Sequence, residues 1–193
     1  MIPLLQYHKL ALLESLMTGA RQVFAAYEQR DFHFDDKLKA WLQQCDQFFE
    51  QHNGPVERSR IKELYTDFIT LLRGTDPYTF TKIESQKRAQ ELNIGYRIAK
   101  QALEVVTVYY EKVDARLKEA EQLIGQLLLA MLQAEMITMV ALGKIKTQRQ
   151  LEALWKKMGE DKQLLVVQKK VLLQISRYDA VLLLEKCLAA LRQ

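Results

Sequence analysis

The chain has few of the residues that break or bend a backbone, with 7 Gly and 3 Pro among 193 residues. A protein built from many short strands needs turn formers at regular intervals, so this shortage argues against an all-β fold. Hydrophobic residues make up 49% and charged residues 27%, which is ordinary for a soluble globular protein. The composition therefore predicts an all-α fold that is long enough to bury a substantial core.

Two cysteines and three histidines are few, and their spacing fits no common metal or redox site. Cys45 and Cys187 have no partner at zinc-ligand or redox spacing. No histidine follows a glutamate by three residues, as a di-metal helical bundle requires. We expect both thiols to pack as small hydrophobic groups, and we interpret unpaired cysteines as typical of a reducing, cytoplasmic compartment. No metal ligand is predicted.

Motifs for catalysis and for phosphate binding are also missing from the sequence. Neither GxxxxGK[ST] nor GxGxxG occurs, and no serine or cysteine lies in a nucleophile motif, although a nucleophile and its base need to be neighbours only in space. Glu135 lies in a very apolar stretch, but its register favours an ion pair or contact with solvent. His52 is interpreted as a capping or packing residue rather than a base. We therefore expect a protein that is not an enzyme and has no cofactor or small-molecule ligand.

The N-terminal residues and the most apolar run do not indicate a membrane protein. MIPLLQYHKLALLESLM lacks the basic start and the small-residue cleavage site of a signal peptide, and its pattern indicates an amphipathic helix. The run 124–145 contains Gln126, Gln133 and Glu135. A carboxylate at the centre of a span opposes insertion by about 2.5–3.5 kcal/mol, so we interpret the run as a buried helix with no transmembrane segment.

Apolar residues are present at helical spacing along most of the chain. The first helix is predicted over about 4–30. A second begins after an N-cap at Asp35, and a third begins at Pro55, whose ring suits the first turn of a helix, and ends near Gly74.

The residues between Thr81 and Leu142 keep a three-four spacing of apolar side chains without a slip. Fifteen of the sixteen register positions between Ala89 and Ala141 are apolar. Such a repeat predicts heptad-like packing along one seam. A single helix over this range would be roughly 93 Å long, which predicts an elongated molecule.

The sequence offers two alternatives for the start of this central helix and contains two glycines in its interior. Either Asp76 caps it, or Thr81 and Glu84 form a capping box. Gly95 and Gly125 each cost about 1 kcal/mol relative to alanine, yet neither interrupts the register, and we favour a continuous helix.

Two more helices are predicted after Gly143. The first, over about 147–158, begins with a capping box of Thr147 and Gln150 and ends at Gly159. The second, over about 162–192, is apolar on most of its circumference and therefore needs several partners. The expected architecture is an elongated helical bundle of about six helices around one long central helix. Its predicted parts are a three-helix region at 1–75, the shared central helix at 76–142 and a basic helical hairpin at 143–193.

The basic charge of the chain is concentrated at its C-terminal end. Residues 143–193 carry 11 Lys/Arg against 5 Asp/Glu, whereas residues 1–75 and 76–142 each have a net charge of −1. The excess is either a solvated face, or a surface for an acidic protein or lipid partner, or a surface for nucleic acid. The candidate interaction surface comprises Lys144, Lys146, Arg149, Trp155, Lys156, Lys157, Lys169 and Lys170.

The sequence has many apolar residues suited to helix packing and few residues with catalytic potential. The candidate seam for helix packing or for an oligomer comprises Tyr110, Val113, Leu117, Ala120, Leu184, Leu188 and Leu191. The leading hypothesis is a non-catalytic helical adaptor or assembly subunit that binds itself or another protein. The alternative is a nucleic-acid-binding protein that uses its basic C-terminal quarter. An enzyme with a site between helices is the third hypothesis.

Overall fold

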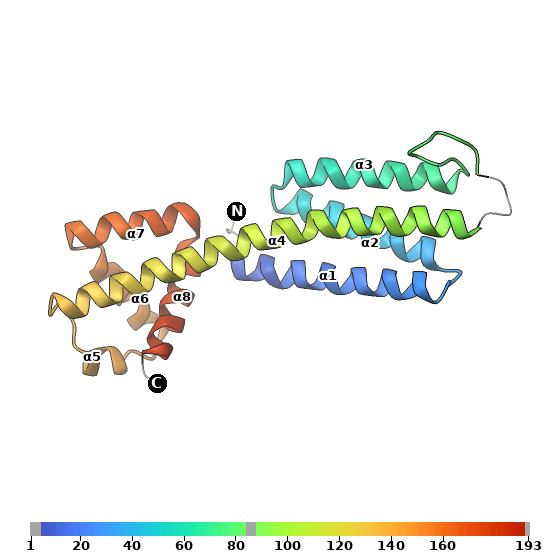
Figure 1. Ribbon diagram of the computed structural model, residues 1–193. Helices are drawn as coiled ribbons and strands as arrows, with labels where there is room; N and C mark the ends of the chain where they lie inside the picture. The colour runs from blue at the N-terminus through green and yellow to red at the C-terminus, as the bar shows by residue number, and fades with distance from the viewer. Residues whose placement is uncertain (1–4, 84–87, 192–193) are drawn as a thin grey trace. The chain divides into compact units, whose positions relative to one another are not determined.

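The structure is a computed structural model that describes residues 5–83 and 88–191, and in this part of the chain it contains eight helices and no strand (Figure 1). The predicted all-α fold is confirmed, and one long helix packs against the others. The helices are α1 (Gln6–Glu28), α2 (Phe34–Gln51), α3 (Pro55–Leu72), α4 (Arg88–Gln133), α5 (Met139–Gly143), α6 (Gln148–Met158), α7 (Lys162–Gln174) and α8 (Arg177–Ala190).

The chain divides into two compact units. One comprises residues 9–111, and the other comprises the described residues 5–8 and 112–191. We call them the first unit and the second unit. The predicted division into 1–75, 76–142 and 143–193 follows the helices rather than these units, and it stays a prediction.

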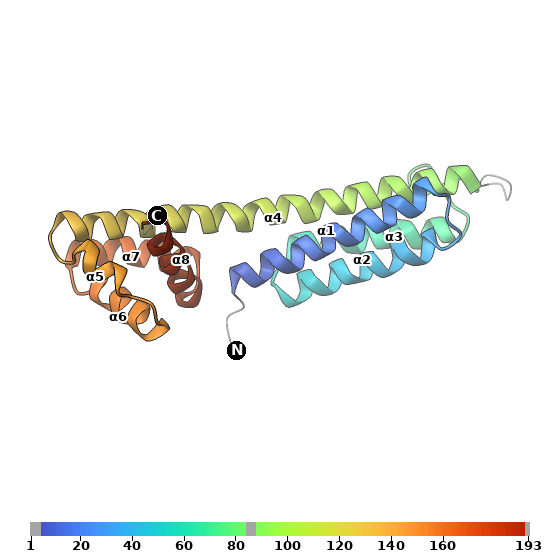
Figure 2. The same ribbon diagram turned by 90° about the horizontal axis from the view of Figure 1, so that it is seen from below.

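The first unit is a four-helix bundle of α1, α2, α3 and the early turns of α4 (Figures 1 and 2). Its core consists of apolar side chains spaced three and four residues apart on each helix, which places them on one face. The indole N–H of Trp41 donates to the backbone oxygen of Leu16 at 2.8 Å, so the one polar group of this buried ring is satisfied. The fully buried core residues are Leu13, Ala20, Phe34, Leu38, Leu42, Cys45, Ile61, Leu64, Phe68, Ile98, Ala99, Ala102 and Val106.

Helix α4 is continuous through both of its glycines, as the register predicted. Gly95 is a packing requirement, because a Cβ atom there would lie 2.7 Å from Cε1 of the fully buried Phe34. Gly125 has no such role, because no atom lies within 4 Å of the corresponding position. Core packing therefore requires glycine at position 95 but not at position 125.

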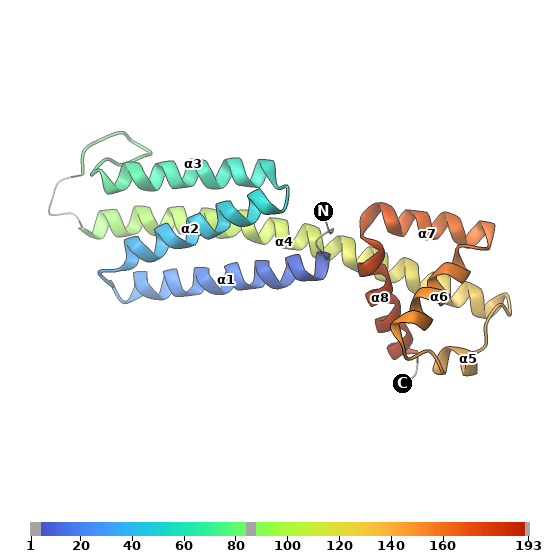
Figure 3. The same cartoon turned by 180° about the vertical axis from the view of Figure 1, so that it is seen from behind.

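In the second unit, α5, α6, α7 and α8 gather around the later turns of α4 (Figure 3). Seam residues of α4 such as Ile124 and Met131 are fully buried here. The off-seam residues of the preceding stretch, 111–122, are exposed or half-buried, as their charges predicted. The fully buried residues of this unit are Ala120, Ile124, Leu128, Met131, Met158, Val171, Asp179, Ala180, Leu183 and Leu184.

The central helix ends earlier than its register predicts, at Gln133 instead of Leu142. Glu135 adopts a left-handed conformation with φ 54°, and the amide of Met136 donates to the carbonyl of Met131 at 3.0 Å. A left-handed residue with a hydrogen bond that spans six residues forms a Schellman motif, which terminates a helix. The apolar residues after it start a separate short helix, α5, which Thr138 caps.

The same kind of ending closes three helices of the first unit. Arg30, Asn53 and Gly74 each have φ between 51° and 75° and follow α1, α2 and α3. The next residue in each case donates its amide to a carbonyl five positions earlier, at distances of 2.9–3.3 Å. Glycine is the commonest residue at this position and asparagine also occurs there, so of the three only Arg30 is an atypical residue type.

The long helix predicted over 162–192 is wrong, because the chain breaks it into α7 and α8. Ile175 is extended, with φ −136° and ψ 164°, and Ser176 then caps α8 by accepting a hydrogen bond from the amide of Asp179. A serine three residues before an aspartate is a helix-start signal, and it outweighs the continuous apolar pattern around it.

Two predicted helix starts also need correction. Asp35 does not cap α2, because His33 holds that position without a side-chain hydrogen bond. The carboxylate of Asp35 instead binds Arg88 of α4 at 2.8 Å. Asp76 starts no helix, since its carboxylate accepts the amide of Tyr78 at 2.8 Å in a turn. The alternative capping box with Glu84 lies outside the described residues.

Candidate interaction site

The predicted basic surface consists largely of exposed side chains of the second unit. All six of its lysines and its one arginine are exposed on or between α5, α6 and α7. Lys157 donates to the carbonyl of Met136 at 2.8 Å, and Lys170 lies 3.5 Å from a carboxylate oxygen of Glu119. Trp155 does not belong to the exposed surface, because it is 3% exposed and packs in the core. Its carbonyl accepts a hydrogen bond of 2.6 Å from the buried side chain of Gln168.

Most of the predicted seam is buried inside the chain. Val113, Leu117 and Ala120 are buried on α4, and Leu184 and Leu188 are buried on α8. Each is therefore covered within the chain, and none offers an open face to a second copy.

The two end members of the predicted seam are less enclosed. Tyr110 is half-buried, and its hydroxyl lies 3.2 Å from a carboxylate oxygen of Glu14. Leu191 is half-buried at the C-cap of α8.

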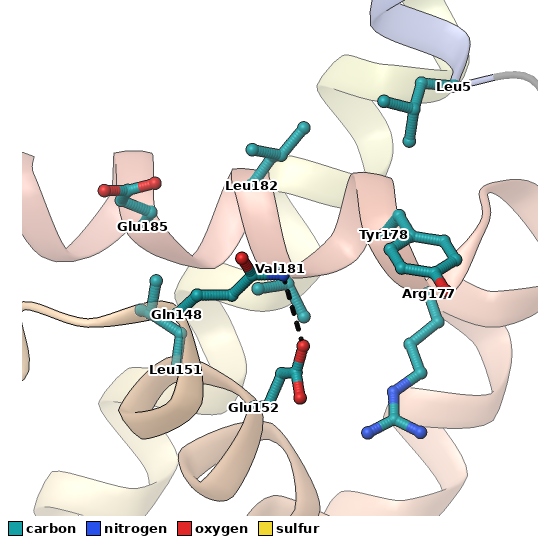
Figure 4. Close-up of a pocket in the computed structure, with 9 residues that line it drawn as sticks. All are labelled: Leu5, Gln148, Leu151, Glu152, Arg177, Tyr178, Val181, Leu182 and Glu185. Carbon is teal, nitrogen blue, oxygen red and sulfur yellow. Dashed lines mark hydrogen bonds between the residues drawn. The ribbon is translucent and has the colours of Figure 1, made fainter.

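A pocket of about 490 Å³ lies between α6 and α8 of the second unit (Figure 4). We call it the α6/α8 groove. Leu151 and Val181 are buried, whereas Leu182 is 42% and Tyr178 57% exposed along the same wall. Its volume falls within the range of specific binding pockets, which is about 300–1,000 Å³. The residues that line it are Leu5, Gln148, Leu151, Glu152, Arg177, Tyr178, Val181, Leu182 and Glu185.

Two helix starts position the walls of this groove. Thr147 and Gln150 form the predicted capping box, in which the Gln150 amide donates to the Thr147 hydroxyl at 3.3 Å and the Gln150 side chain accepts the Thr147 amide at 3.1 Å. Ser176 and Asp179 start α8 on the other side, with 2.8 Å between the serine hydroxyl and the carboxylate. Both caps satisfy amides that the first helical turn leaves without a partner.

Asp179 also holds the N-terminal end of α1 against α8. Its fully buried carboxylate accepts the backbone amides of Gln6 at 3.1 Å and of Tyr7 at 3.5 Å. A carboxylate at a helix N-terminus is favoured by the helix dipole and satisfies exposed donors. Leu5 precedes these residues directly, so this contact places it at the edge of the groove.

The α6/α8 groove continues along α8 and carries charge on its rim. A smaller pocket of about 120 Å³ shares Leu151 and Glu185 with it and reaches Leu188. Figure 4 shows the Glu152 carboxylate and the Arg177 guanidinium on the same side of the larger pocket. Glu152 also accepts a hydrogen bond of 3.3 Å from Gln148. Among the residues that line the larger pocket, two carboxylates and one guanidinium give a net negative charge, whereas Lys146 lines the smaller pocket.

The lining of the α6/α8 groove lacks several residue types that are common in active sites. Among the described lining residues, there is no serine, cysteine or histidine to act as a nucleophile or as a base of ordinary pKa near neutrality. The described residues also contain no group of three His, Cys, Asp or Glu side chains close enough to hold a metal ion. An apolar floor with a charged rim is the arrangement that receives an amphipathic segment of another protein.

The remaining candidate residues have structural positions. Glu135 is exposed in the turn after α4, and His52 is the buried C-cap of α2, with its ring centroid 4.4 Å from that of Phe48. Both cysteines are free, and burial raises the pKa of the Cys45 thiol to about 12. Burial also raises the pKa of the Cys187 thiol.

None of the described helices has the length and apolar character needed to cross a membrane. No protein-family model matches the chain, and neither a curated protein nor a solved structure matches it significantly. The inferences about function therefore depend on the residues themselves.

Proposed function

We propose that this protein is a helical adaptor or assembly subunit, without catalytic activity of its own, that binds another protein through the α6/α8 groove. The observation that carries the proposal is the pairing of a buried apolar floor with exposed apolar walls at Tyr178 and Leu182. Apolar side chains that line a concave surface favour a partner that removes them from water, by about 25 cal/mol per Å² buried.

The charge of the rim specifies the kind of segment that fits. Glu152 and Glu185 flank the apolar floor, and Arg177 is the one basic residue of the lining. An amphipathic helix with an apolar anchor and a neighbouring lysine or arginine would satisfy both features. Most of the seam predicted for self-association is buried within the chain, so we favour a different protein as the partner.

Site-specific crosslinking tests this proposal. A photoreactive benzoylphenylalanine at position 182 should crosslink to a partner that mass spectrometry identifies, whereas the same probe at position 153 should not. Ala153 is the control because it is exposed on α6 and does not line the groove. Equal crosslinking at both positions, or none at either, would contradict the proposal.

The purified partner then allows a quantitative test. Leu182→Glu and Glu152→Lys should each weaken its binding by about tenfold or more, since each removes an apolar or a charge contact worth about 1.4 kcal/mol. Ala153→Glu should leave the affinity unchanged. Light scattering on the isolated chain detects the alternative outcome, a homo-oligomer, which would replace the partner by a second copy.

Binding to nucleic acid is a second candidate function. It is favoured by Arg149 and Lys156, which lie seven residues apart on the exposed face of α6, with Lys157 beside them. Basic side chains along one helix neutralise phosphates and make binding dependent on salt. The double variant Lys156→Glu and Lys157→Glu should abolish a salt-dependent mobility shift, and Lys100→Glu serves as the matched charge control. Absence of a shift at low salt would exclude this candidate.

A further inference from the structure

The exposed face of α7 carries lysines and apolar side chains in one line. Lys162, Val166, Lys169 and Leu173 follow each other at spacings of four, three and four residues, and all four are exposed. Val166 is 68% exposed and Leu173 is 88% exposed. Residues at this spacing share one narrow stripe of a helix, which we call the α7 stripe.

The orientation of α7 is fixed by its opposite face. Leu164, Val171 and the extended residue Ile175 are buried there. Gln168 lies among them, and its amide donates to the carbonyl of Trp155 at 2.6 Å. A rotation that turned Val166 and Leu173 inward would break this bond and bury lysines, so the stripe faces water in the isolated chain.

The α7 stripe has the register of one half of a coiled-coil seam. In heptad terms, Val166 and Leu173 occupy one core position and Lys162 and Lys169 occupy the other. Neither of these two lysines has an ion-pair partner within the described part of the chain. A helix that binds the α7 stripe would therefore place apolar side chains against Val166 and Leu173 and carboxylates against the two lysines.

A second copy of α7 does not complete this seam. In a parallel pair, each lysine would meet the equivalent lysine, and like charges at facing positions are repulsive. In an antiparallel pair, each lysine would meet Val166 or Leu173, which buries an ammonium group without a counterion.

Membranes and nucleic acids fit the α7 stripe less well than an acidic helix does. A membrane-binding helix separates its apolar face from its polar face, whereas the lysines and apolar residues of α7 alternate along the same line. A nucleic acid would satisfy Lys162 and Lys169 but would leave Val166 and Leu173 against charged phosphates.

We propose that the α7 stripe binds an acidic amphipathic helix of a protein partner, with apolar side chains against Val166 and Leu173 and glutamate or aspartate against Lys162 and Lys169. This surface is separate from the lining of the α6/α8 groove, so the inference goes beyond the proposed function. This inference and the proposed function can each be refuted without affecting the other, because they involve different residues and different charges.

Three synthetic helices test the inference. Each is an alanine-rich peptide of about four heptads with leucine at one core position, and the other core position holds glutamate, glutamine or lysine. Fluorescence anisotropy should give the order glutamate, then glutamine, then lysine, with at least about tenfold between the first and the last. The affinity for the glutamate peptide should fall as salt is added.

Variants of the full chain locate the binding surface. Lys169→Glu should weaken binding of the glutamate peptide by about tenfold and should improve binding of the lysine peptide. Leu173→Gln should weaken binding of all three. Lys100→Glu makes the same charge change on α4, outside both proposed surfaces, and should change nothing. All three residues are exposed, and circular dichroism is used to check that each variant is folded.

Several outcomes would overturn the inference. Equal affinity for the three peptides would exclude charge recognition, and an equal effect of Lys100→Glu would place binding elsewhere. Vesicles containing phosphatidylserine and a DNA duplex are assayed in parallel. If either binds with sensitivity to Lys169→Glu while no peptide binds, the stripe is a lipid or nucleic-acid surface instead.

Discussion

Replacing Gly95 by alanine is expected to destabilise the first unit, whereas replacing Gly125 by alanine is expected to stabilise α4. Both glycines lie in the interior of the same helix, where alanine is favoured by about 1 kcal/mol. A Cβ atom at position 95 would lie 2.7 Å from Cε1 and 3.2 Å from Cζ of Phe34, which are contacts with a rigid buried ring. At position 125 the new methyl group meets no atom within 4 Å.

The expected magnitudes follow from these two environments. Overpacking a well-filled core costs about 1–3 kcal/mol, so Gly95→Ala should lower the free energy of unfolding by about 0–2 kcal/mol after the gain in helix propensity. Gly125→Ala should raise it by about 0.5–1 kcal/mol. The two variants should therefore differ by about 0.5–3 kcal/mol although the chemical change is identical.

Tryptophan fluorescence during urea unfolding can follow each unit separately. The chain has two tryptophans, and Trp41 lies in the first unit while Trp155 lies in the second. Gly95→Ala is measured in a Trp155→Phe background and Gly125→Ala in a Trp41→Phe background, each against its own parent. A change of 1 kcal/mol moves the urea midpoint by about 0.3–1 M.

A background with a smaller residue at position 34 separates packing from helix propensity. In Phe34→Leu chains, Gly95→Ala should become neutral or stabilising, because the aromatic atoms that crowd the new methyl group are absent. Equal stabilisation by Gly95→Ala and Gly125→Ala in the parent chain would refute the explanation given for Gly95.

Three further predictions concern other positions. Asp179→Ala should destabilise the second unit by about 1–3 kcal/mol, measured by Trp155 fluorescence, because the amides of Gln6 and Tyr7 lose their acceptor. Glu135→Gly should stabilise it by about 0.5–1 kcal/mol in the same assay, since glycine adopts a left-handed conformation without strain; an unchanged midpoint would count against strain at Glu135. Burial raises the pKa of the Cys45 thiol from 9.0 to about 12, so the unfolded chain loses this proton first. The stabilising effect is complete below pH 9 and is lost at about 1.4 kcal/mol per pH unit above it, and Cys45→Ala should remove that slope in unfolding measured at several pH values.

The starts of α3 and α6 were predicted correctly from sequence, because their signals are local. Pro55 occupies the first turn of α3, and the capping box of Thr147 and Gln150 starts α6. Gly159 ends that helix, as predicted. In each case the residues that mark the helix end in the sequence are also the residues that form it in the structure. No residue from elsewhere in the chain is needed.

The end of α4 was not predictable in the same way. Its terminating residue is Glu135, a residue type with no preference for the left-handed conformation that it adopts. The strain costs about 1–2 kcal/mol, and burial of residues such as Met131 and Leu142 on either side of the turn can offset a cost of that size. The position where α4 ends is therefore determined by tertiary packing, which leaves no pattern in the local sequence.

The α6/α8 groove was missed for a related reason. Tyr178 and Leu182 match the apolar register of one long helix, and this register predicts burial for both. The extended conformation of Ile175 interrupts the register, and α8 then presents these two side chains to the groove. The spacing of Ser176 and Asp179 is the one signal that indicated the break. For Trp155, the neighbouring lysines suggested an exposed side chain, whereas its helical register indicated the core. The structure agrees with the register, because Trp155 is buried.

The contact between Asp179 and the amide of Gln6 joins residues that are 173 positions apart. Closing a flexible loop of that length would cost on the order of 4–5 kcal/mol in chain entropy. If residues 9–111 have already folded, most of that length is no longer flexible and the remaining entropy loss is smaller. We therefore expect a fixed order of folding during synthesis on the ribosome. The first unit folds while the rest of the chain is still being made, and the amides in the first turn of α1 become buried only after α8 has formed.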